Sequence, residues 1–254
     1  MSMKQDIEKG EVETTQQVEA TPPSRANLQY APNHNGANGS AYPPRPLPGS
    51  HIANPGTLGL FSFASTTFVL SMYNARVRSI TEPNVVVGLA LFFGGIAQML
   101  AGMWEFPRGN AFGATAFTSY GAFWLSYATI LIPSSGIGAA YVGTADAPIA
   151  GGEAMLADAI GIYLMMWMMV TFFLFIASLK RPVPFAALFG MLCLTFLLLG
   201  VGEFNAAPNV TRAGGITGVI TAFIAYGIGL CELVGWPLGP VPWKDEARVL
   251  GRFP

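Results

Sequence analysis

The sequence predicts an all-α integral membrane protein, and three observations support that fold class. Charged residues make up 11% of the 254 residues, against about 25% in soluble domains. Hydrophobic residues make up 52%, and they gather in six runs that are long enough to cross a bilayer. The runs do not show the alternation of apolar and polar residues that the strands of a membrane barrel require. We therefore expect six transmembrane helices in each protomer.

A polar segment, residues 1–53, comes first, and we expect it to be a disordered cytoplasmic tail. It is rich in Pro, Asn, Gln, Ser and Gly, and it has no apolar stretch of the kind found in signal peptides. The helical domain is expected over residues 54–236, and a short cytoplasmic tail over residues 237–254. The six expected helices are Leu58–Met72, Val85–Trp104, Ala111–Ile132, Ala157–Leu179, Pro184–Val201 and Gly215–Leu233.

The stretch from Asn54 to Leu60 marks the start of the first helix. Pro55 fixes φ and has no N–H, so it suits the first turn of a helix or the residues just before it. Asn54 is of the residue type that accepts hydrogen bonds from the free N–H groups of a first turn. Taken alone, this stretch predicts a helix start and nothing more.

Lys and Arg near the membrane predict the orientation. Seven of them lie on the side of the N-terminal segment (Arg45, Arg108, Lys180, Arg181, Lys244, Arg248 and Arg252), and three lie on the opposite side (Arg76, Arg78 and Arg212). Because Lys and Arg are enriched on the cytoplasmic side, both termini are expected in the cytoplasm. We expect a multi-pass protein of the plasma membrane.

Hydroxyl residues are concentrated in the first and third expected helices. Ser62, Ser65 and Thr66 share one helical face, and so do Thr115, Thr118 and Ser119. These groups either bond to their own backbone carbonyls one turn earlier or line a polar pathway for a small solute. The glycines of the second, third and sixth helices are expected to let neighbouring helices approach closely.

Ionisable residues are absent from the centre of every expected span, although such residues mark the proton relays of many pumps. Glu232, flanked by Cys231 and Leu233, is the most nearly buried acid at a helix border and the candidate for a proton-linked group. The two cysteines lie in apolar segments, and no motif for a metal, a cofactor or soluble-type catalysis is present. A net charge of −1 gives no basic field for nucleic acid. We expect no enzyme, no cofactor and no nucleic-acid partner.

Five motifs, taken in order along the chain, carry a resemblance to a known family. Asn54-Pro55-Gly56-Thr57-Leu58-Gly59-Leu60 resembles the signature N-P-A-P-L-G-L of the acetate uptake transporters. It is followed by Phe93–Gln98, Ala101–Glu105, Gly109–Gly113 and Thr118–Trp124. The family includes bacterial acetate/succinate permeases and fungal acetate and ammonia-associated membrane proteins, and the long polar tail is more similar to the fungal members. Gly56 and Thr57 stand where the signature has alanine and proline.

The resemblance implies a six-helix protomer with its own pathway, assembled into a hexamer in the lipid bilayer. Phe63 and Tyr120 match positions of an apolar constriction in family members, and Leu194 is the matching leucine of the fifth helix. Asn54, Leu58 and Glu105 match signature positions. On this basis, the expected substrates are acetate and related small monocarboxylates, with succinate as a further possibility, moved by proton-coupled uptake or by channel-like permeation.

A mechanism follows from joining the resemblance to the residue types. Asn54, Gln98, Thr118 and Ser119 are expected to offer hydrogen bonds to the carboxylate, while Phe63, Tyr120 and Leu194 form a narrow apolar gate. Two other functions stay open at this point: export of ammonia or ammonium, and a membrane sensor of acetate whose tail carries the signal. The residues alone do not decide whether a proton travels on the substrate or on a protein group such as Glu232.

Overall fold

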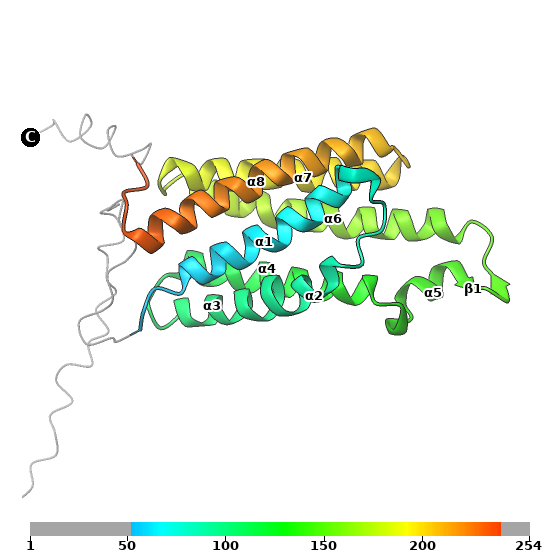
Figure 1. Cartoon of the computed structure of the whole chain (residues 1–254), viewed down its shortest axis with the longest axis horizontal. Helices are drawn as coiled ribbons and strands as arrows, with labels where there is room; N and C mark the ends of the chain where they lie inside the picture. Colours follow the sequence, from blue (N-terminus) through cyan, green and yellow to red (C-terminus); the bar gives the residue numbers. More distant parts are fainter. Residues whose placement is uncertain (1–51, 240–254) are drawn as a thin grey trace, which may run out of the picture. The chain divides into compact units, whose positions relative to one another are not determined.

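The computed structural model describes residues 52–239, and this part of the chain is built almost entirely from helices (Figure 1). The expected tails, apart from their residues nearest the helices, lie outside the described range. In chain order the helices and strands are α1 (Gly56–Asn74), α2 (Val86–Leu91), α3 (Gln98–Glu105), α4 (Ala111–Leu131), α5 (Ile137–Val142), β1 (Gly143–Thr144), β2 (Ala147–Pro148), α6 (Gly152–Ser178), α7 (Val183–Phe204) and α8 (Pro208–Val234). A π-helical segment, η3 (Phe92–Ala97), joins α2 to α3.

All six apolar runs are helical, but two helices begin earlier than the sequence predicts. α6 begins at Gly152 rather than Ala157, and α8 begins at Pro208 rather than Gly215. Both early starts have a physical reason: the first turns of these helices are too polar for a hydropathy pattern to detect, and Pro208 is well suited to a first turn. The short helix α5 and the β1–β2 hairpin between α4 and α6 were not predicted.

The helices pack lengthwise, with α1 between α8 and the group formed by α2, α3 and α4 (Figure 1). α7 lies against both α6 and α8. Glycines allow the closest approaches, as expected. A Cβ on Gly102 of α3 would meet the backbone nitrogen of Thr118 on α4, and one on Gly215 of α8 would meet the backbone nitrogen of Ala75 after α1. The bundle therefore depends on small residues where backbones touch.

Four helical segments among the described residues are long and apolar enough to cross a membrane. They are Val86–Glu105, Gly152–Ser178, Val183–Phe204 and Pro208–Val234. α1 and α4 have 19 and 21 residues, and each contains more Ser and Thr residues than any of these four segments.

The π-helical segment interrupts the second long helix at its middle. Gly94 and Gly95 lie in this segment, where an added Cβ would lie 2.6 Å from Thr66 Oγ1 of α1 and 2.7 Å from Leu125 Cδ2 of α4, respectively. Single π-helical turns often occur at functional sites. The residue that follows the segment is Gln98, which is only 1% exposed.

Candidate functional site

Two connected cavities, each of about 30 Å³, lie inside the bundle. They share the lining residues Leu70, Asn74, Phe123 and Leu199, so they are direct neighbours. The first is also lined by Phe63 and Trp124, and the second extends to Tyr127, Leu164 and Glu203. A space of this volume holds a water molecule but not a carboxylic acid with several heavy atoms. In this structure the interior therefore has room for water but not for such an acid.

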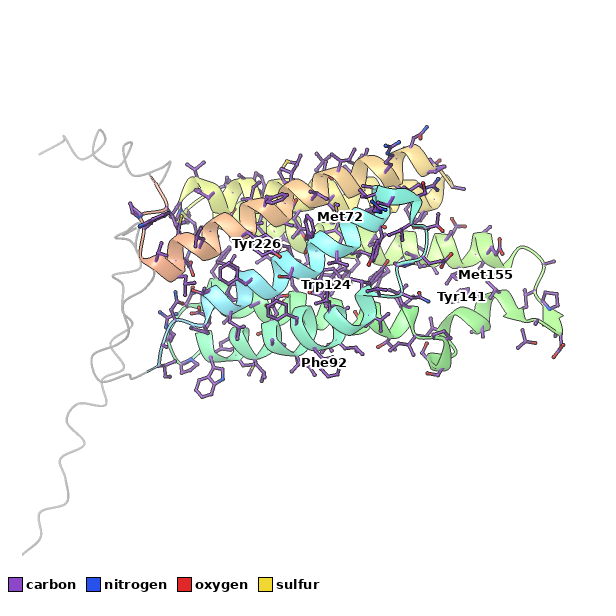
Figure 2. All side chains as sticks on the ribbon, viewed as in Figure 1. Met72, Phe92, Trp124, Tyr141, Met155 and Tyr226 are labelled. Carbon is purple, nitrogen blue, oxygen red and sulfur yellow. The ribbon has the colours of Figure 1, made fainter. Side chains whose placement is uncertain are left out.

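Two of the lining helices present one continuous face each to this space. On α1 the lining residues are Phe63, Thr67, Leu70, Ser71 and Asn74, and on α7 they are Leu192, Thr195, Phe196, Leu199 and Glu203. Both sets follow the spacing of three and four residues that places side chains on one side of a helix. α4 adds an aromatic wall of Phe123, Trp124 and Tyr127; Figure 2 shows Trp124 in the middle of the bundle.

Two polar groups at the first cavity have no hydrogen-bond partner in the part of the chain that the structure describes. The Thr67 hydroxyl and the Trp124 indole N–H are buried and make no hydrogen bond within residues 52–239. Buried polar groups are normally satisfied, because leaving one unpaired costs free energy. Two unpaired donors beside one cavity therefore indicate a place where a polar solute or water can bind.

An aromatic layer separates the cavity from one end of the bundle. The ring of Phe63 lies 5.5 Å from that of Tyr120, and Tyr120 lies 6.3 Å from Phe189. Phe189 in turn contacts Phe112 at 5.4 Å. Tyr120 also hydrogen-bonds to Thr171 of α6 through its hydroxyl, at 2.9 Å. This bond fixes the position of the Tyr120 ring within the aromatic layer.

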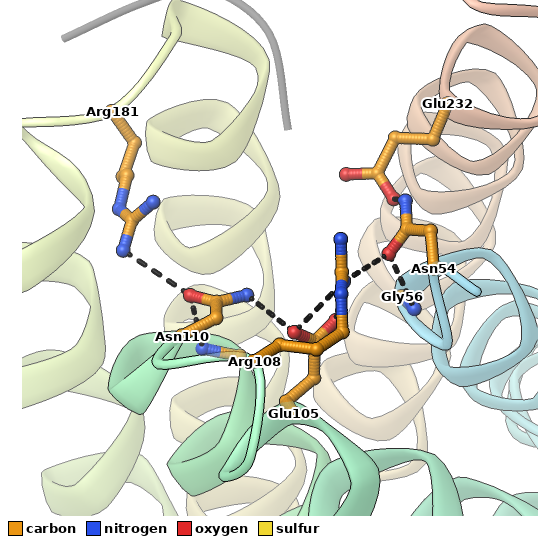
Figure 3. Close-up of polar contacts among 8 residues, drawn as sticks. Asn54, Gly56, Glu105, Arg108, Asn110, Arg181 and Glu232 are labelled. Carbon is orange, nitrogen blue, oxygen red and sulfur yellow. Dashed lines mark hydrogen bonds and ion pairs between the residues drawn. The ribbon is translucent and has the colours of Figure 1, made fainter. Parts of the chain in front are cut away.

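A hydrogen-bonded group of charged and amide residues closes the same end of the bundle. We call it the paired cluster: Asn54, Glu105, Arg108, Asn110, Arg181 and Glu232 (Figure 3). Arg108 donates to Asn54 Oδ1 at 2.7 Å and forms an ion pair with Glu105 at 3.1 Å. Asn54 donates to Glu232 Oε2 at 3.3 Å. Side chains 178 positions apart in sequence are thereby joined, and α1 is tied to both α3 and α8.

Asn110 extends the paired cluster to the connection between α6 and α7. Its amide donates to Glu105 at 3.1 Å, and its oxygen accepts from the Gly113 N–H, capping α4, and from Arg181 at 3.4 Å. Arg181 also lies over the ring of Phe112, with 5.0 Å between its guanidinium carbon and the ring centre. Burial lowers the pKa of Arg181 below its ordinary value, while Glu105 and Glu232 act in the opposite direction. An arginine nevertheless stays protonated in proteins.

Comparison with known proteins places the chain in a family. Residues 38–235 match the model of the GPR1/FUN34/yaaH family. The chain belongs to this family. Among its members, the Ammonia transport outward protein 2 of Saccharomyces cerevisiae is 50% identical over 71% of this chain and 61% of its own length. The Acetate permease A of Emericella nidulans is 41% identical over 78% of this chain and 69% of its own length. This chain thus spans less than two thirds of the length of the yeast relative.

A solved member of the GPR1/FUN34/yaaH family supports the fold. The structure described as the bacterial acetate channel SatP superposes with a TM-score of 0.62 at 33% identity, covering 75% of this chain and 99% of the other. The helical arrangement is therefore that of the family.

The structure separates the predicted site residues into three groups. Phe63 and Tyr120 lie together in the aromatic layer, and Phe63 also lines the cavity. Asn54, Glu105 and Glu232 lie in the paired cluster. The remaining predicted residues, Leu58, Gln98, Thr118, Ser119 and Leu194, do not line the two cavities.

On α7, the leucine that lines the cavity with Phe63 is Leu192 and not Leu194. Leu194 is 40% exposed, whereas Leu192 is buried and lines the cavity beside Phe63. A step of two residues turns a helix through about 200°, so the two side chains point to opposite sides. The match to Leu194 rested on sequence alone, which does not define which side of α7 faces the interior of the bundle.

The predicted hydroxyl faces also differ from the face that lines the cavity. Ser62, Ser65 and Thr66 bond to carbonyl oxygens one turn earlier, which confirms the local alternative. Thr118 lies against Gly102 of α3, between two packed helices. The cavity is lined instead by Thr67, Ser71 and Asn74, whose spacing of four and three residues was visible in the sequence.

Gln98 differs from the other predicted residues that do not line the cavities, because its polar side chain is buried. Both polar atoms of its carboxamide are buried and lack a hydrogen-bond partner in the described part of the chain. Leu58 is 45% exposed at the start of α1, and Ser119 is partly buried. Gln98 therefore remains a candidate for contact with a solute, whereas the position of Leu58 gives no support for such a role.

Proposed function

We propose that this protein transports acetate and related small monocarboxylates across a membrane, through a pathway contained in each protomer. The observation that carries the proposal is the pair of neighbouring cavities inside the bundle, with unpaired donors on α1 and α4 and an aromatic layer at one end. Membership of the GPR1/FUN34/yaaH family and the names of Acetate permease A and the acetate channel SatP support it.

The finer architecture is part of the same proposal. α1 and α4 are the first and third of six spans, and their polar character reflects the pathway that they line. Residues 54–236 form the transport domain, with tails at 1–53 and 237–254 in the cytoplasm, and six copies assemble in the plasma membrane. The paired cluster then lies at the cytoplasmic side, and Glu203 lies toward the outside.

The pathway lowers the barrier to the solute with fixed hydrogen-bonding groups. Thr67, Ser71 and Asn74 replace part of the water that the solute loses on entry. Phe63 and Tyr120, with Leu192 in the role expected of Leu194, form the apolar gate. Such a gate distinguishes acids weakly, by roughly 1–3 kcal/mol per methylene, so propionate also passes. The other proposed contacts are Asn54, Gln98, Thr118 and Ser119.

Glu232 is the proposed protein group for proton coupling at the paired cluster. Its carboxylate accepts from Asn54, and Gly56 leaves it space, because a Cβ there would lie 2.8 Å from Glu232 Oε2. Glu232→Gln keeps the shape but removes the titration. We expect the dependence of acetate uptake on external pH to become shallower in this variant, measured with labelled acetate. Unchanged pH dependence would remove Glu232 from the mechanism.

The function is tested with the purified full-length protein in liposomes. Labelled acetate, propionate and methylammonium are supplied outside, with and without an inward proton gradient. Saturable acetate uptake that the gradient accelerates is the expected result. Liposomes that take up none of the acids faster than protein-free liposomes would contradict transport and favour the sensor, whose signalling would then be lost on deletion of residues 2–50.

A second candidate function is movement of ammonium, and one observation favours it. Glu203 lies at the second cavity beside Tyr127, whose ring stacks on Phe123 at 5.7 Å. A carboxylate beside aromatic rings is a feature of cation entrances. Ammonia transport also appears in the name of the yeast relative. Methylammonium uptake in the liposome experiment, without acetate uptake, would select this function.

A further inference from the structure

The paired cluster holds two arginines close to the aromatic layer, whereas the cavities have none. Neither Lys, Arg nor His is among the residues that line the two described cavities. Beyond the aromatic layer, Arg108 and Arg181 both belong to the paired cluster. A guanidinium binds a carboxylate through two parallel N–H donors. These two arginines are therefore the groups to compare as binding partners for a carboxylate solute.

Arg108 is held by acceptors of the protein itself. Its Nη1 donates to Asn54 Oδ1 at 2.7 Å and to the two carboxylate oxygens of Glu105 at 3.2 and 3.1 Å. The residue is only 5% exposed. A solute could take this guanidinium only by displacing Glu105, whose buried carboxylate would then lose its cation. Arg108 therefore serves the structure of the cluster.

Arg181 is held by an aromatic ring and one amide. Its guanidinium carbon lies 5.0 Å from the centre of the Phe112 ring, and its Nη2 donates to Asn110 Oδ1 in a long bond of 3.4 Å (Figure 3). Among residues 52–239, it has no ion pair, and Glu105 and Glu232 act on it only at longer range. An arginine has five N–H donors. Four of them therefore make no hydrogen bond in the described part of the chain.

Phe112 connects Arg181 to the aromatic layer. The ring of Phe112 lies 5.4 Å from that of Phe189, which in turn lies 6.3 Å from that of Tyr120. A cation over an aromatic face is attracted by the π electrons of the ring. This contact keeps the guanidinium beside the layer and uses none of its N–H donors. A solute that has passed Tyr120 thus reaches a cation at the next ring but one.

We propose that Arg181 binds the carboxylate of the solute on the paired-cluster side of the aromatic layer, through N–H donors that the described residues leave unused. The inference rests on the proposed transport of monocarboxylates and adds a binding residue to it. The ligand class is a small organic anion whose carboxylate fits the two-donor fork of a guanidinium. Arg181 is then a specificity-determining residue, which favours carboxylates over uncharged solutes and over ammonium.

The charges of the paired cluster link this site to Glu232. The groups that act on Glu232 are its hydrogen-bond donor Asn54 and the charged side chains of Glu105, Arg108 and Arg181. The two arginines balance the two carboxylates. When Glu232 takes up a proton, one positive charge is in excess, and a carboxylate at Arg181 restores the balance. Binding of the anion and binding of the proton therefore favour each other, in agreement with the proton coupling proposed for Glu232.

The test measures binding of acetate to the full-length protein in detergent, through the rise in unfolding temperature that a bound ligand causes. Sodium acetate is compared with sodium chloride at equal ionic strength and mildly acidic pH. Acetate is expected to stabilise the wild type. Arg181→Gln should need roughly tenfold more acetate for the same rise, because it loses a charge-assisted pair. Lys180→Gln removes the same charge from the adjacent, exposed residue and should behave as wild type.

A conservative variant keeps the test decisive if Arg181→Gln does not fold. Arg181→Lys retains the charge but lacks the fork of donors, so its affinity for acetate should lie below that of the wild type. Wild-type affinity in Arg181→Lys would overturn the inference. So would equal responses of Arg181→Gln and Lys180→Gln, or stabilisation by chloride as strong as that by acetate.

The pH dependence of binding tests the link to Glu232. Acetate affinity of the wild type should rise from neutral to mildly acidic pH, where most acetate is still the anion. Glu232→Gln is uncharged throughout and should keep the higher affinity at both pH values. The same rise in both proteins would overturn the link.

Binding and uptake together separate this inference from transport itself. Acetate binding that depends on Arg181, in a protein that takes up no acetate in liposomes, would contradict only the transport proposal. Acetate uptake by the wild type, with unchanged acetate binding in Arg181→Gln, would contradict only the role of Arg181.

Discussion

The two ends of the interior differ in how their polar groups are satisfied. In the paired cluster, Asn54, Glu105 and Asn110 bond to one another or to an arginine. At the cavity, the donors of Thr67 and Trp124 have no partner within residues 52–239, and Glu203 lies beside open space. These polar groups of the paired cluster are thus satisfied by bonds within the protein, whereas the cavity end retains donors that a bound solute can use.

This difference also suggests how the pathway opens. For a solute to leave through the paired cluster, the bonds from Asn54 to Arg108 and Glu232 must break, because they join α1 to the loop after α3 and to α8. At the cavity end, hydroxyl bonds join α4 to α6 through Ser126 and Tyr163 and α7 to α8 through Thr195 and Thr217, whereas the ion pair lies in the paired cluster. Opening is thus expected to require movement of the helix ends around Asn54, and the predictions below test the two ends in turn.

The largest expected effect comes from breaking the ion pair of the paired cluster. Arg108→Met leaves the carboxylate of Glu105, which is 1% exposed, without its cation. Removing one member of a buried pair costs about 3–5 kcal/mol. We expect a loss of that size in the free energy of unfolding in detergent. Arg212→Met, on an exposed residue, is the control, and equal losses in the two variants would show that the cluster is not what stabilises this end.

The aromatic layer gives the next largest effect, on selectivity. Phe63→Leu removes a ring that contacts Tyr120 and lines the cavity. Each methylene admitted is worth roughly 1–3 kcal/mol, so uptake of butyrate relative to acetate should rise about tenfold. Competition of unlabelled acids with labelled acetate measures the ratio, and an unchanged ratio would place the gate elsewhere.

The smallest expected effect is the change in stability when an unpaired donor is removed. Thr67→Val removes a hydroxyl without a protein partner, so we expect a change within about 0.5 kcal/mol. Thr195→Val removes a hydroxyl that bonds to Met191 and Thr217, and should cost about 1 kcal/mol. Chemical denaturation in detergent compares them, and slower acetate uptake is expected for Thr67→Val. A larger loss of stability for Thr67→Val than for Thr195→Val would contradict the assignment of free and satisfied groups.

The helices could be predicted from the sequence because long apolar runs have few alternatives in a bilayer. α1 begins at Gly56, two residues before the expected Leu58 but within the stretch from Asn54 to Leu60 that local chemistry marked as a helix start. Asn54 Oδ1 accepts from the Gly56 N–H, as the residue type suggested. The pairing of Asn54 with Glu232 could not be predicted, because it depends on how distant helices meet. The choice of Leu192 over Leu194 depended in the same way on the rotation of α7.

The short elements between α4 and α6 could not be predicted from the sequence for a different reason. α5 and the β1–β2 hairpin contain few residues and carry no strong periodic pattern. Glu203 was recognised as a border acid, but its place beside Tyr127 at the cavity required the packed helices. Arg108 and Arg181 were used only to predict the orientation, although Arg108 directly precedes the Gly109–Gly113 motif, and this position was a usable signal.

The central claim is that the solute passes through the cavity beside Phe63, and one pair of variants tests it most directly. Leu192→Trp fills the cavity, whereas Leu194→Trp adds the same bulk on the exposed face two residues away. Overpacking costs about 1–3 kcal/mol, so we predict that labelled acetate uptake into liposomes falls about tenfold or more for Leu192→Trp and changes little for Leu194→Trp. Equal uptake by the two variants, or a greater loss for Leu194→Trp, would contradict the account.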